Sequence, residues 1–497
     1  MNFDRRPVTP TADRSRLDAA LAAASLPARS IIARAVGAVA PAAVIGGAVT
    51  SGIARTGSNS LPLVFVLTAA VFALFSVGYL AAVRRFLPVD ASGAFYTIVG
   101  HALGRVVGAG AGWLAVAAYA AMPVCLYGLI GSSVSPFLSD LFTVSVPWQP
   151  IALGAALLIG WLGLIGTEAS TRVLMVLVAA EIATIIVVSV ANWAHAAPVG
   201  DVFASLNPRL FAASMAVISA QFALGLLSFI GTELTVTHTQ DSRDGHRGVA
   251  RATYATIGLL ALIYILAISG MSATLGADGV VVAARTDASG MFFSTAQANL
   301  GNVAATITRV VFATSLLAGA IAFHCATSRY CFFLGRDRTA PAFLGRPHPR
   351  YGSPFIASLA QTTLALIAIA VVSAVDADPQ VVLFYIGGAA GAVGILILLA
   401  LTALATAVML LRRTPSYPRR TGIAATAVIS ALLLGTLTGF VLVKLDTLLG
   451  VPAASAVPDV LRLTYLGIVL VGGLWHWLQR RRRTSDRRNS TRATEYS

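Results

Sequence analysis

Long apolar segments recur along nearly the whole chain, and they constrain its fold more than any other feature. A helix needs about 20 apolar residues to cross the hydrocarbon core of a bilayer. Only 11% of the 497 residues are charged, against roughly 25% in a soluble domain. The sequence therefore predicts an all-α membrane protein of twelve transmembrane helices, with approximate cores at 31–54, 62–83, 106–135, 150–167, 173–194, 210–233, 252–274, 303–328, 354–374, 380–410, 421–443 and 460–479.

The basic residues predict which side of the membrane each connection faces. The formal net charge is +15. If both termini are cytoplasmic, most Lys and Arg fall on the inner side, as is usual for cytoplasmic connections. Arginine far outnumbers lysine, which suggests a GC-rich bacterial genome. We therefore expect a bacterial cytoplasmic (inner) membrane protein with both ends inside. Its basic C-terminal tail would contact anionic lipid headgroups rather than nucleic acid.

The polar stretches of the chain are too short to hold a soluble catalytic domain. The seven histidines are scattered, and neither a His-Glu-x-x-His nor a Gly-x-Ser-x-Gly motif occurs. Cys125, Cys325 and Cys331 do not have the spacing of metal ligands. A membrane-embedded enzyme is therefore disfavoured, and we expect neither a cofactor nor a metal site.

The first apolar segment contains residues that interrupt a regular helix. Pro41 has no backbone N–H to donate and its ring clashes with the preceding turn. The small residues Ala40, Ala42 and Ala43 surround it. An unwound turn here would free N–H groups at the positive end of a half-helix, which attracts a carboxylate. We expect these four residues to contact a substrate; the alternative is a proline kink packed against a neighbouring helix.

The sixth apolar segment ends with a glycine beside an acid, within 228–233. Gly231 can adopt backbone angles that other residues resist, so we expect the helix to break there and turn bare backbone toward a cavity. The carbonyls of Ser228, Phe229 and Ile230 could then accept an ammonium group, and the ring of Phe229 could cover the substrate. The alternative for Phe229 is ordinary packing against lipid or another helix.

Interrupted helices in the first and sixth positions predict an inverted repeat. Helices one to five and six to ten would form two units, and an odd number of helices places the second unit in the opposite orientation. Secondary transporters of this kind bind substrate between the two breaks. The expected divisions are an N-terminal cytoplasmic tail, a transport core, two additional helices and a basic cytoplasmic tail, at 1–30, 31–410, 411–479 and 480–497.

Two acids within the apolar segments are candidates for coupling or gating. A charge in the middle of a bilayer is costly unless it is neutralised or paired. Glu181 lies deep in the fifth helix, where it would carry a coupling proton or, alternatively, bond a neighbouring helix as a protonated carboxyl. Glu233 is expected near the inner end of the break in helix six. There it would relay protons or pair with an arginine of an intracellular gate.

Thr314 and Ser315 in the eighth helix offer two adjacent hydroxyl groups. With carbonyls of helix one they could form a sodium site, since hard cations prefer oxygen ligands. The alternative is common in membrane helices, where such hydroxyls bond to the backbone of their own helix.

Four short motifs are more specific than the apolar pattern. They are Phe-Ile-Gly-Thr-Glu, a Ser-Arg element followed by Gly-Arg-Asp, Tyr-Gly-Ser-Pro, and the loop before the third helix, at 229–233, 323–341, 351–354 and 88–96. These motifs resemble the amino acid–polyamine–organocation (APC) superfamily, in its branch of bacterial amino acid permeases. Together they are spread over most of residues 30–410, and the element after helix eight is the most specific.

The resemblance implies a five-plus-five inverted-repeat fold with broken helices one and six and two further C-terminal helices. By analogy, residues 40–43 would meet a carboxylate and residues 229–231 an amine. The chain departs from the family in its first break, which reads Ala-Pro-Ala in place of a Gly-Ser-Gly type. It departs again at Glu181, near which many proton-coupled relatives carry a lysine.

We therefore expect a permease that moves amino acids or related amines by alternating access, with H⁺ as the coupling ion. A sodium-coupled symporter, an exchanger of the same fold and a non-transporting amine receptor are alternatives. The major facilitator class also has twelve helices. It is disfavoured because the loop at 83–88 lacks the Gly-x-x-x-Asp-Arg-x-Gly-Arg-Arg pattern typical of that class.

Overall fold

The structure is a computed structural model that describes residues 26–87, 93–165, 171–196, 215–239, 242–287, 290–412, 421–452 and 454–495. Apart from one bridge between Leu26 and Ser242, the regular elements of these residues are helices. In chain order they are α2 (Ala28–Val39), α3 (Pro41–Ala43), η1 (Val44–Val49), α4 (Thr50–Thr56), α5 (Leu61–Phe86), α6 (Ala94–Leu103), α7 (Arg105–Phe142), α8 (Trp148–Ile165), α9 (Thr171–Ala194), α10 (Met215–Leu227), η5 (Thr232–His238), α11 (Gly245–Leu275), α12 (Ala277–Thr286), α13 (Met291–Leu300), α14 (Asn302–Arg336), η6 (Ala342–Gly345), α15 (Phe355–Ala374), η7 (Gln380–Gly387), α16 (Gly388–Leu411), α17 (Thr421–Val443), α18 (Leu445–Leu449) and α19 (Val457–Glu495).

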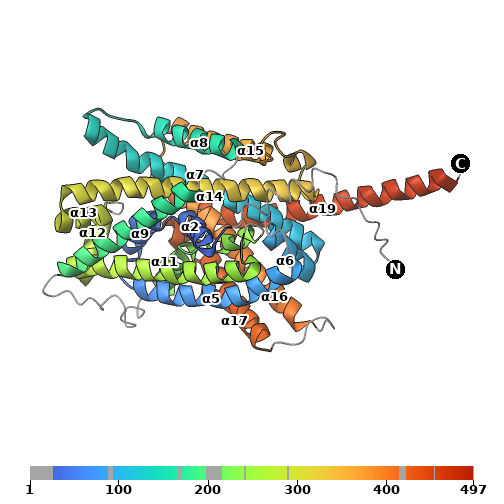
Figure 1. Cartoon of the computed structure of the whole chain (residues 1–497), viewed down its shortest axis with the longest axis horizontal. Coiled ribbons are helices and arrows are strands. Elements are labelled where there is room, and N and C mark those ends of the chain that lie inside the picture. The colour runs from blue at the N-terminus through green and yellow to red at the C-terminus, as the bar shows by residue number, and fades with distance from the viewer. Residues whose placement is uncertain are drawn as a thin grey trace.

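Within the described residues, 11 helices are long and apolar enough to cross a membrane. They correspond to all but one of the expected segments, and the expected all-α membrane fold is confirmed. The remaining segment, expected at 150–167, is α8, which has 18 residues. At 1.5 Å per residue it spans about 27 Å, slightly less than the hydrocarbon core of about 30 Å. The expected count of twelve therefore depends on a helix at the lower limit of length, which packs beside α15 (Figure 1).

The long helices run roughly along one axis and form a single bundle (Figure 1). The long helix α7 lies within this bundle and contacts α14, α16, α19 and α6. Helix α14 has 35 residues, or about 52 Å, so it extends beyond a bilayer core of about 30 Å. Helix α19 continues past the expected boundary at residue 479 and projects beyond the bundle at its C-terminal end (Figure 1).

The first transmembrane helix is divided into α2, α3, η1 and α4. Helix α2 ends at Val39, and the φ of 53° and ψ of 67° of the next residue, Ala40, lie in the left-handed region. The proline that follows disfavours the right-handed helical conformation for the residue before it. The helix resumes at Pro41, which suits a first helical position because it needs no N–H partner there. The backbone of helix one therefore breaks at the position that the sequence predicts.

The sixth transmembrane helix is divided into α10 and η5. Gly231, directly before the 3₁₀ segment, has a φ of 112°. An L-residue with a side chain rarely adopts this angle, whereas glycine does so without a steric penalty. The second expected break is therefore also present, and residues 210–214 of the expected segment lie outside the described residues.

The short helix α6 is fastened to the C-terminal end of α14. The hydroxyl of Tyr96 donates to the carboxylate of Asp337, and the hydroxyl of Thr339 lies 3.2 Å from the Tyr96 oxygen. Burial, and after it the hydrogen bond to Asp337, raise the pKa of Tyr96 to about 12, so its hydroxyl remains a donor at physiological pH. These contacts join the connection before α7 to the Gly-Arg-Asp motif that the sequence singled out; residues 88–92 of that connection lie outside the described residues.

Candidate functional site

An acid of helix five caps the break in helix one. The backbone N–H of Ala42 donates to Oε1 of Glu181 over 2.7 Å, and the hydroxyl of Ser315 donates to the same oxygen over 2.5 Å. Glu181 is only 2% exposed. The first N–H groups of a helix have no partner within that helix, and a carboxylate is a strong acceptor for them. Glu181 lies in α9, the fifth expected transmembrane helix, and Ser315 lies in α14, the eighth. Glu181 therefore joins helices one, five and eight at the break.

A second acid caps the break in helix six. The N–H of Gly231 donates to Oε2 of Glu233 over 2.8 Å. The hydroxyl of Tyr119, on α7, donates to Oε1 of Glu233 over 2.7 Å. Both side chains are buried. The described partners of Glu233 are thus a tyrosine and the broken backbone itself, whereas the sequence suggested an arginine.

The two breaks lie against each other. A Cβ atom built on Gly231 would lie 3.0 Å from the Cγ2 atom and 3.2 Å from the backbone nitrogen of Val39. Helix eight also comes close, because a Cβ atom on Gly319 would lie 2.9 Å from the Cβ atom of Ala40. Small residues are therefore required where helices one, six and eight meet.

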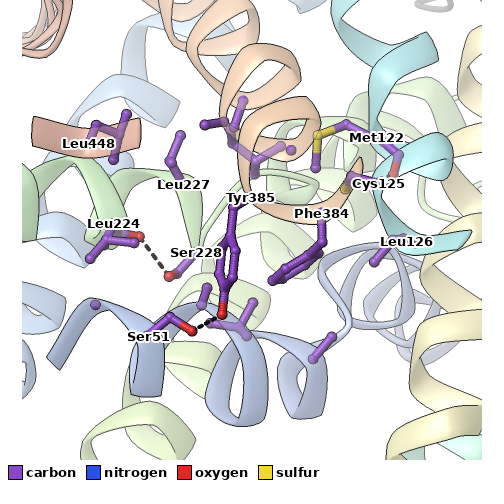
Figure 2. Close-up of a pocket in the computed structure, with 18 of the residues that line it drawn as sticks. Ser51, Met122, Cys125, Leu126, Leu224, Leu227, Ser228, Phe384, Tyr385 and Leu448 are labelled. Carbon is purple, nitrogen blue, oxygen red and sulfur yellow. Dashed lines mark hydrogen bonds between the residues drawn. The ribbon is translucent and has the colours of Figure 1, made fainter. Parts of the chain in front are cut away.

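A cavity lies beside the two breaks. Residues of helix one, α7, α10 with the turn after it, α14, η7, α16 and α18 line it. Its volume is about 140 Å³, roughly ten times the ~10–15 Å³ needed by one water molecule. Figure 2 shows Leu224, Leu227 and Ser228 of helix six on one side and Met122, Cys125 and Leu126 of α7 on the other. Apolar walls with a few polar groups are typical of sites for small molecules.

An arginine and a tyrosine stand at the mouth of this cavity. The hydroxyl of Tyr385 in η7 forms a short hydrogen bond with the hydroxyl of Ser51 in α4 (Figure 2). The guanidinium of Arg55 lies 4.6 Å from the centroid of the Tyr385 ring, and its Nη1 atom is 3.5 Å from the carbonyl oxygen of Leu448. Arg55 is exposed. Three elements thus meet around the opening. They are α4 of helix one, η7 at the start of the tenth expected transmembrane helix, and α18.

Three of the residues expected to contact a substrate line the cavity, namely Ala43, Ser228 and Ile230. Phe229 is fully buried and does not line it. Its ring packs instead against the side chains of three other aromatic residues, Phe65, Phe72 and Tyr264.

The other expected site residues form the structure around the cavity. Ala40, Pro41, Ala42 and Gly231 belong to the breaks but are not among the lining residues. The hydroxyl of Thr314 donates to the carbonyl of Val311 in its own helix over 2.9 Å. Its neighbour Ser315 donates to Glu181, so the two adjacent hydroxyls serve different partners.

The carbonyl groups at the break of helix six differ in their partners. The hydroxyl of Tyr264 donates to the carbonyl of Ser228 over 2.9 Å. The carbonyl of Phe229 accepts from both the N–H and the hydroxyl of Thr232. Among the described residues, none donates to the carbonyl of Ile230. Ile230 is therefore the residue of this turn with an acceptor still available beside the cavity.

Most of the side chains that line the cavity could not be identified from the sequence. Arg55 and Tyr385 flank the opening, yet neither belongs to a break or to one of the motifs. Arg55 carried one usable signal, since it is a cation at the end of an apolar segment and away from the basic clusters. Tyr385 carried none, because only the packing of helix ten decides which of its faces meets helix one.

Comparison with known proteins agrees with this architecture. The family model described as amino acid permease matches residues 30–489. Over 143 residues the chain is 30% identical to the histidine permease HisP of Lactococcus lactis subsp. cremoris (strain MG1363), and this stretch covers 28% of the chain and 30% of that permease. The match spans less than a third of the relative. The family model, however, covers nearly the whole chain, and the chain therefore belongs to the amino acid permease family, as a multi-pass membrane protein and not an enzyme.

Proposed function

We propose that this permease is a secondary active transporter that moves amino acids or related amines across the bacterial cytoplasmic membrane. The observation that carries the proposal is the cavity beside two broken helices whose free backbone groups are capped by buried acids. Bare backbone at membrane depth is tolerated where it is buried in protein or lines a cavity. Broken helices that face each other are the common form of substrate site in secondary transporters.

We assign one backbone donor and one backbone acceptor beside the cavity to the charged groups of an amino acid. Ala43 lines the cavity within the first turn of α3, where N–H groups point toward anions. We assign its N–H to the carboxylate of the substrate. Ile230 also lines the cavity, and we assign its carbonyl to the ammonium group. The neighbouring donor of Ala42 is held by Glu181.

Glu181 is the group that we assign to proton coupling. Its carboxylate holds the N–H of Ala42 and the hydroxyl of Ser315. Protonation would weaken it as an acceptor, since charged acceptors form the stronger hydrogen bonds. Helix one would then be released from helices five and eight. A proton that binds at Glu181 would in this way favour movement of the break, which couples the proton to alternating access.

The remaining features of the proposal follow the sequence pattern. Helices one to five and six to ten form the inverted repeat, with α17 and α19 as the additional pair. Both termini face the cytoplasm, because the basic connections would then lie inside. Glu233 serves the break in helix six as a gating residue. A sodium ion bound near Thr314 and Ser315 is the alternative coupling ion.

Uptake into sealed proteoliposomes tests the proposal. Labelled amino acids, with histidine included because of the related permease, and labelled polyamines are offered under an imposed pH gradient or sodium gradient in turn. Accumulation driven by the pH gradient is the expected result. Accumulation driven by the sodium gradient alone would show that Na⁺, and not H⁺, is the coupling ion. Uptake that occurs only when the vesicles contain substrate would identify an exchanger. Binding without movement in any of these arms would favour a receptor and contradict transport.

A further inference from the structure

The charge and lining of the cavity also indicate which class of amino acid it accepts. We propose that the substrate is a net-neutral amino acid with an apolar side chain, and that Arg55 at the mouth excludes cationic amines. This inference rests on the proposed function, since it takes the cavity to be the substrate site. It narrows that function from amino acids and amines in general to one class.

Arg55 is the one ionised side chain among the described residues that line the cavity. The nearby acids do not line it, because Glu181 is bound to Ala42 and Ser315 while Glu233 is bound to Gly231 and Tyr119. A lysine side chain or a polyamine would thus enter a largely apolar space without a counter-charge. Burial of an unpaired charge is strongly unfavourable, so the walls themselves disfavour cations.

The positive charge of Arg55 adds a barrier at the opening. Its described contacts are the ring of Tyr385 and the carbonyl of Leu448, neither of which carries a neutralising charge. Among the described residues it forms no ion pair. An exposed arginine that lines a largely apolar cavity repels other cations and leaves neutral molecules largely unaffected. A zwitterionic amino acid has no net charge and would pass.

The walls next to the breaks favour an apolar side chain. They consist mainly of aliphatic, thioether and aromatic groups, from Met122, Leu126, Leu224, Leu227, Phe323 and Phe384. Burial of apolar surface in such a site is favourable, whereas a charged or strongly polar substrate side chain would lose its hydration. Backbone groups at Ala43 and Ile230 can meet the charges that all amino acids share. The side-chain end of the cavity therefore selects the class.

Norleucine, lysine and glutamate test this assignment, because norleucine and lysine share their carbon chain and differ by one ammonium group. Binding is measured with the full chain in detergent by ligand-dependent thermal stabilisation, and transport by uptake into proteoliposomes. We expect norleucine to bind and enter. Lysine and glutamate should each be weaker by about tenfold or more, the ratio that ~1.4 kcal/mol produces. Putrescine should be inert.

Two substitutions at Arg55 test its role, and Lys444 supplies the matched control. Arg55→Glu should raise the ratio of lysine to norleucine uptake by about tenfold, and Arg55→Gln should give an intermediate ratio. Lys444 is exposed and lies near α18 but does not line the cavity. Lys444→Glu makes the same change in charge, and we expect it to leave the ratio unchanged.

The results separate this inference from the transport function. The proposed substrate class would be overturned if the unaltered protein bound lysine, putrescine or glutamate as well as it binds norleucine. An unchanged ratio of lysine to norleucine uptake in Arg55→Glu would also overturn it. Uptake of lysine in preference to norleucine would support the transport function and contradict the proposed substrate class. Selective binding of norleucine without uptake would have the opposite meaning, because it would support the class and contradict the transport function.

Discussion

The backbone N–H of Ala42 lies 2.7 Å from Oε1 of Glu181, so an acid from helix five caps the half-helix that follows the break in helix one. The two residues are 139 positions apart in the chain. The same oxygen accepts the hydroxyl of Ser315 from helix eight. One carboxylate therefore links three helices at the break in helix one.

Replacement of Glu181 by Gln should uncouple transport from the pH gradient. The amide oxygen can still accept from Ala42 and Ser315, so the fold is retained, but the side chain no longer binds and releases a proton. Accumulation driven by the pH gradient should fall to the level of equilibration, while exchange of internal for external substrate persists. Both modes are measured in the same proteoliposomes. Unchanged accumulation would remove Glu181 from the coupling mechanism.

Replacement of Gly231 by Val should abolish uptake. A β-branched residue can adopt a φ of 112° only at a high energetic cost. The new side chain would also overlap Val39 of helix one. Gly258 in α11 is the matched control, since a Cβ atom there meets nothing within 4 Å. Gly258→Val should transport normally. Membrane insertion is checked for both variants, and normal uptake by Gly231→Val would contradict the assignment of the break.

Replacements of Ala40 should separate backbone strain from side-chain contact. A left-handed alanine carries roughly 1–2 kcal/mol of strain, and glycine removes it. Ala40→Gly should therefore stabilise the protein in detergent or leave its melting temperature unchanged. Ala40→Val should lower that temperature, because valine tolerates this backbone poorly and the Cβ atom of Ala40 already packs close to Gly319 of helix eight. Equal melting temperatures of the two variants would argue against a left-handed residue at this position.

Tyr119 and Glu233 should be energetically coupled. Tyr119→Phe removes the hydroxyl that donates to Oε1 of Glu233 and leaves that oxygen without this buried partner, which costs about 1–3 kcal/mol. Glu233→Gln removes the charge but keeps an acceptor for Gly231. A double-mutant cycle on unfolding in detergent measures the coupling, which we expect to exceed about 0.5 kcal/mol. Strictly additive effects would show that this hydrogen bond does not contribute.

The breaks could be predicted from the sequence because their causes are local. Pro41 cannot continue a hydrogen-bonded turn, and Gly231 next to an acid in an apolar segment marks a position where backbone freedom is used. The transmembrane spans could also be predicted from the sequence, since apolar length alone identifies them. The segment expected at 150–167 is α8, whose 18 residues stand at the limit of that criterion.

The contacts between helices that are distant in the sequence could not be predicted in the same way. The pairing of Glu181 with Ala42 depends on the packing of helices five and one, and no short-range pattern encodes it. For Phe229 the sequence left two possibilities open, a ring over the substrate or ordinary packing, and the structure places its ring among Phe65, Phe72 and Tyr264. Whether the ring of Phe229 faces the cavity or the other aromatic side chains depends on the path of the chain after the break.

The central claim is that the cavity beside the two breaks serves proton-driven transport of an amino acid. Accumulation of labelled norleucine in sealed proteoliposomes, with the interior alkaline and sodium absent, tests it most directly. The account predicts accumulation above equilibrium that a proton ionophore abolishes and that Glu181→Gln lacks. Equilibration without accumulation in vesicles shown to hold the pH gradient, or accumulation that only a sodium gradient drives, would contradict it.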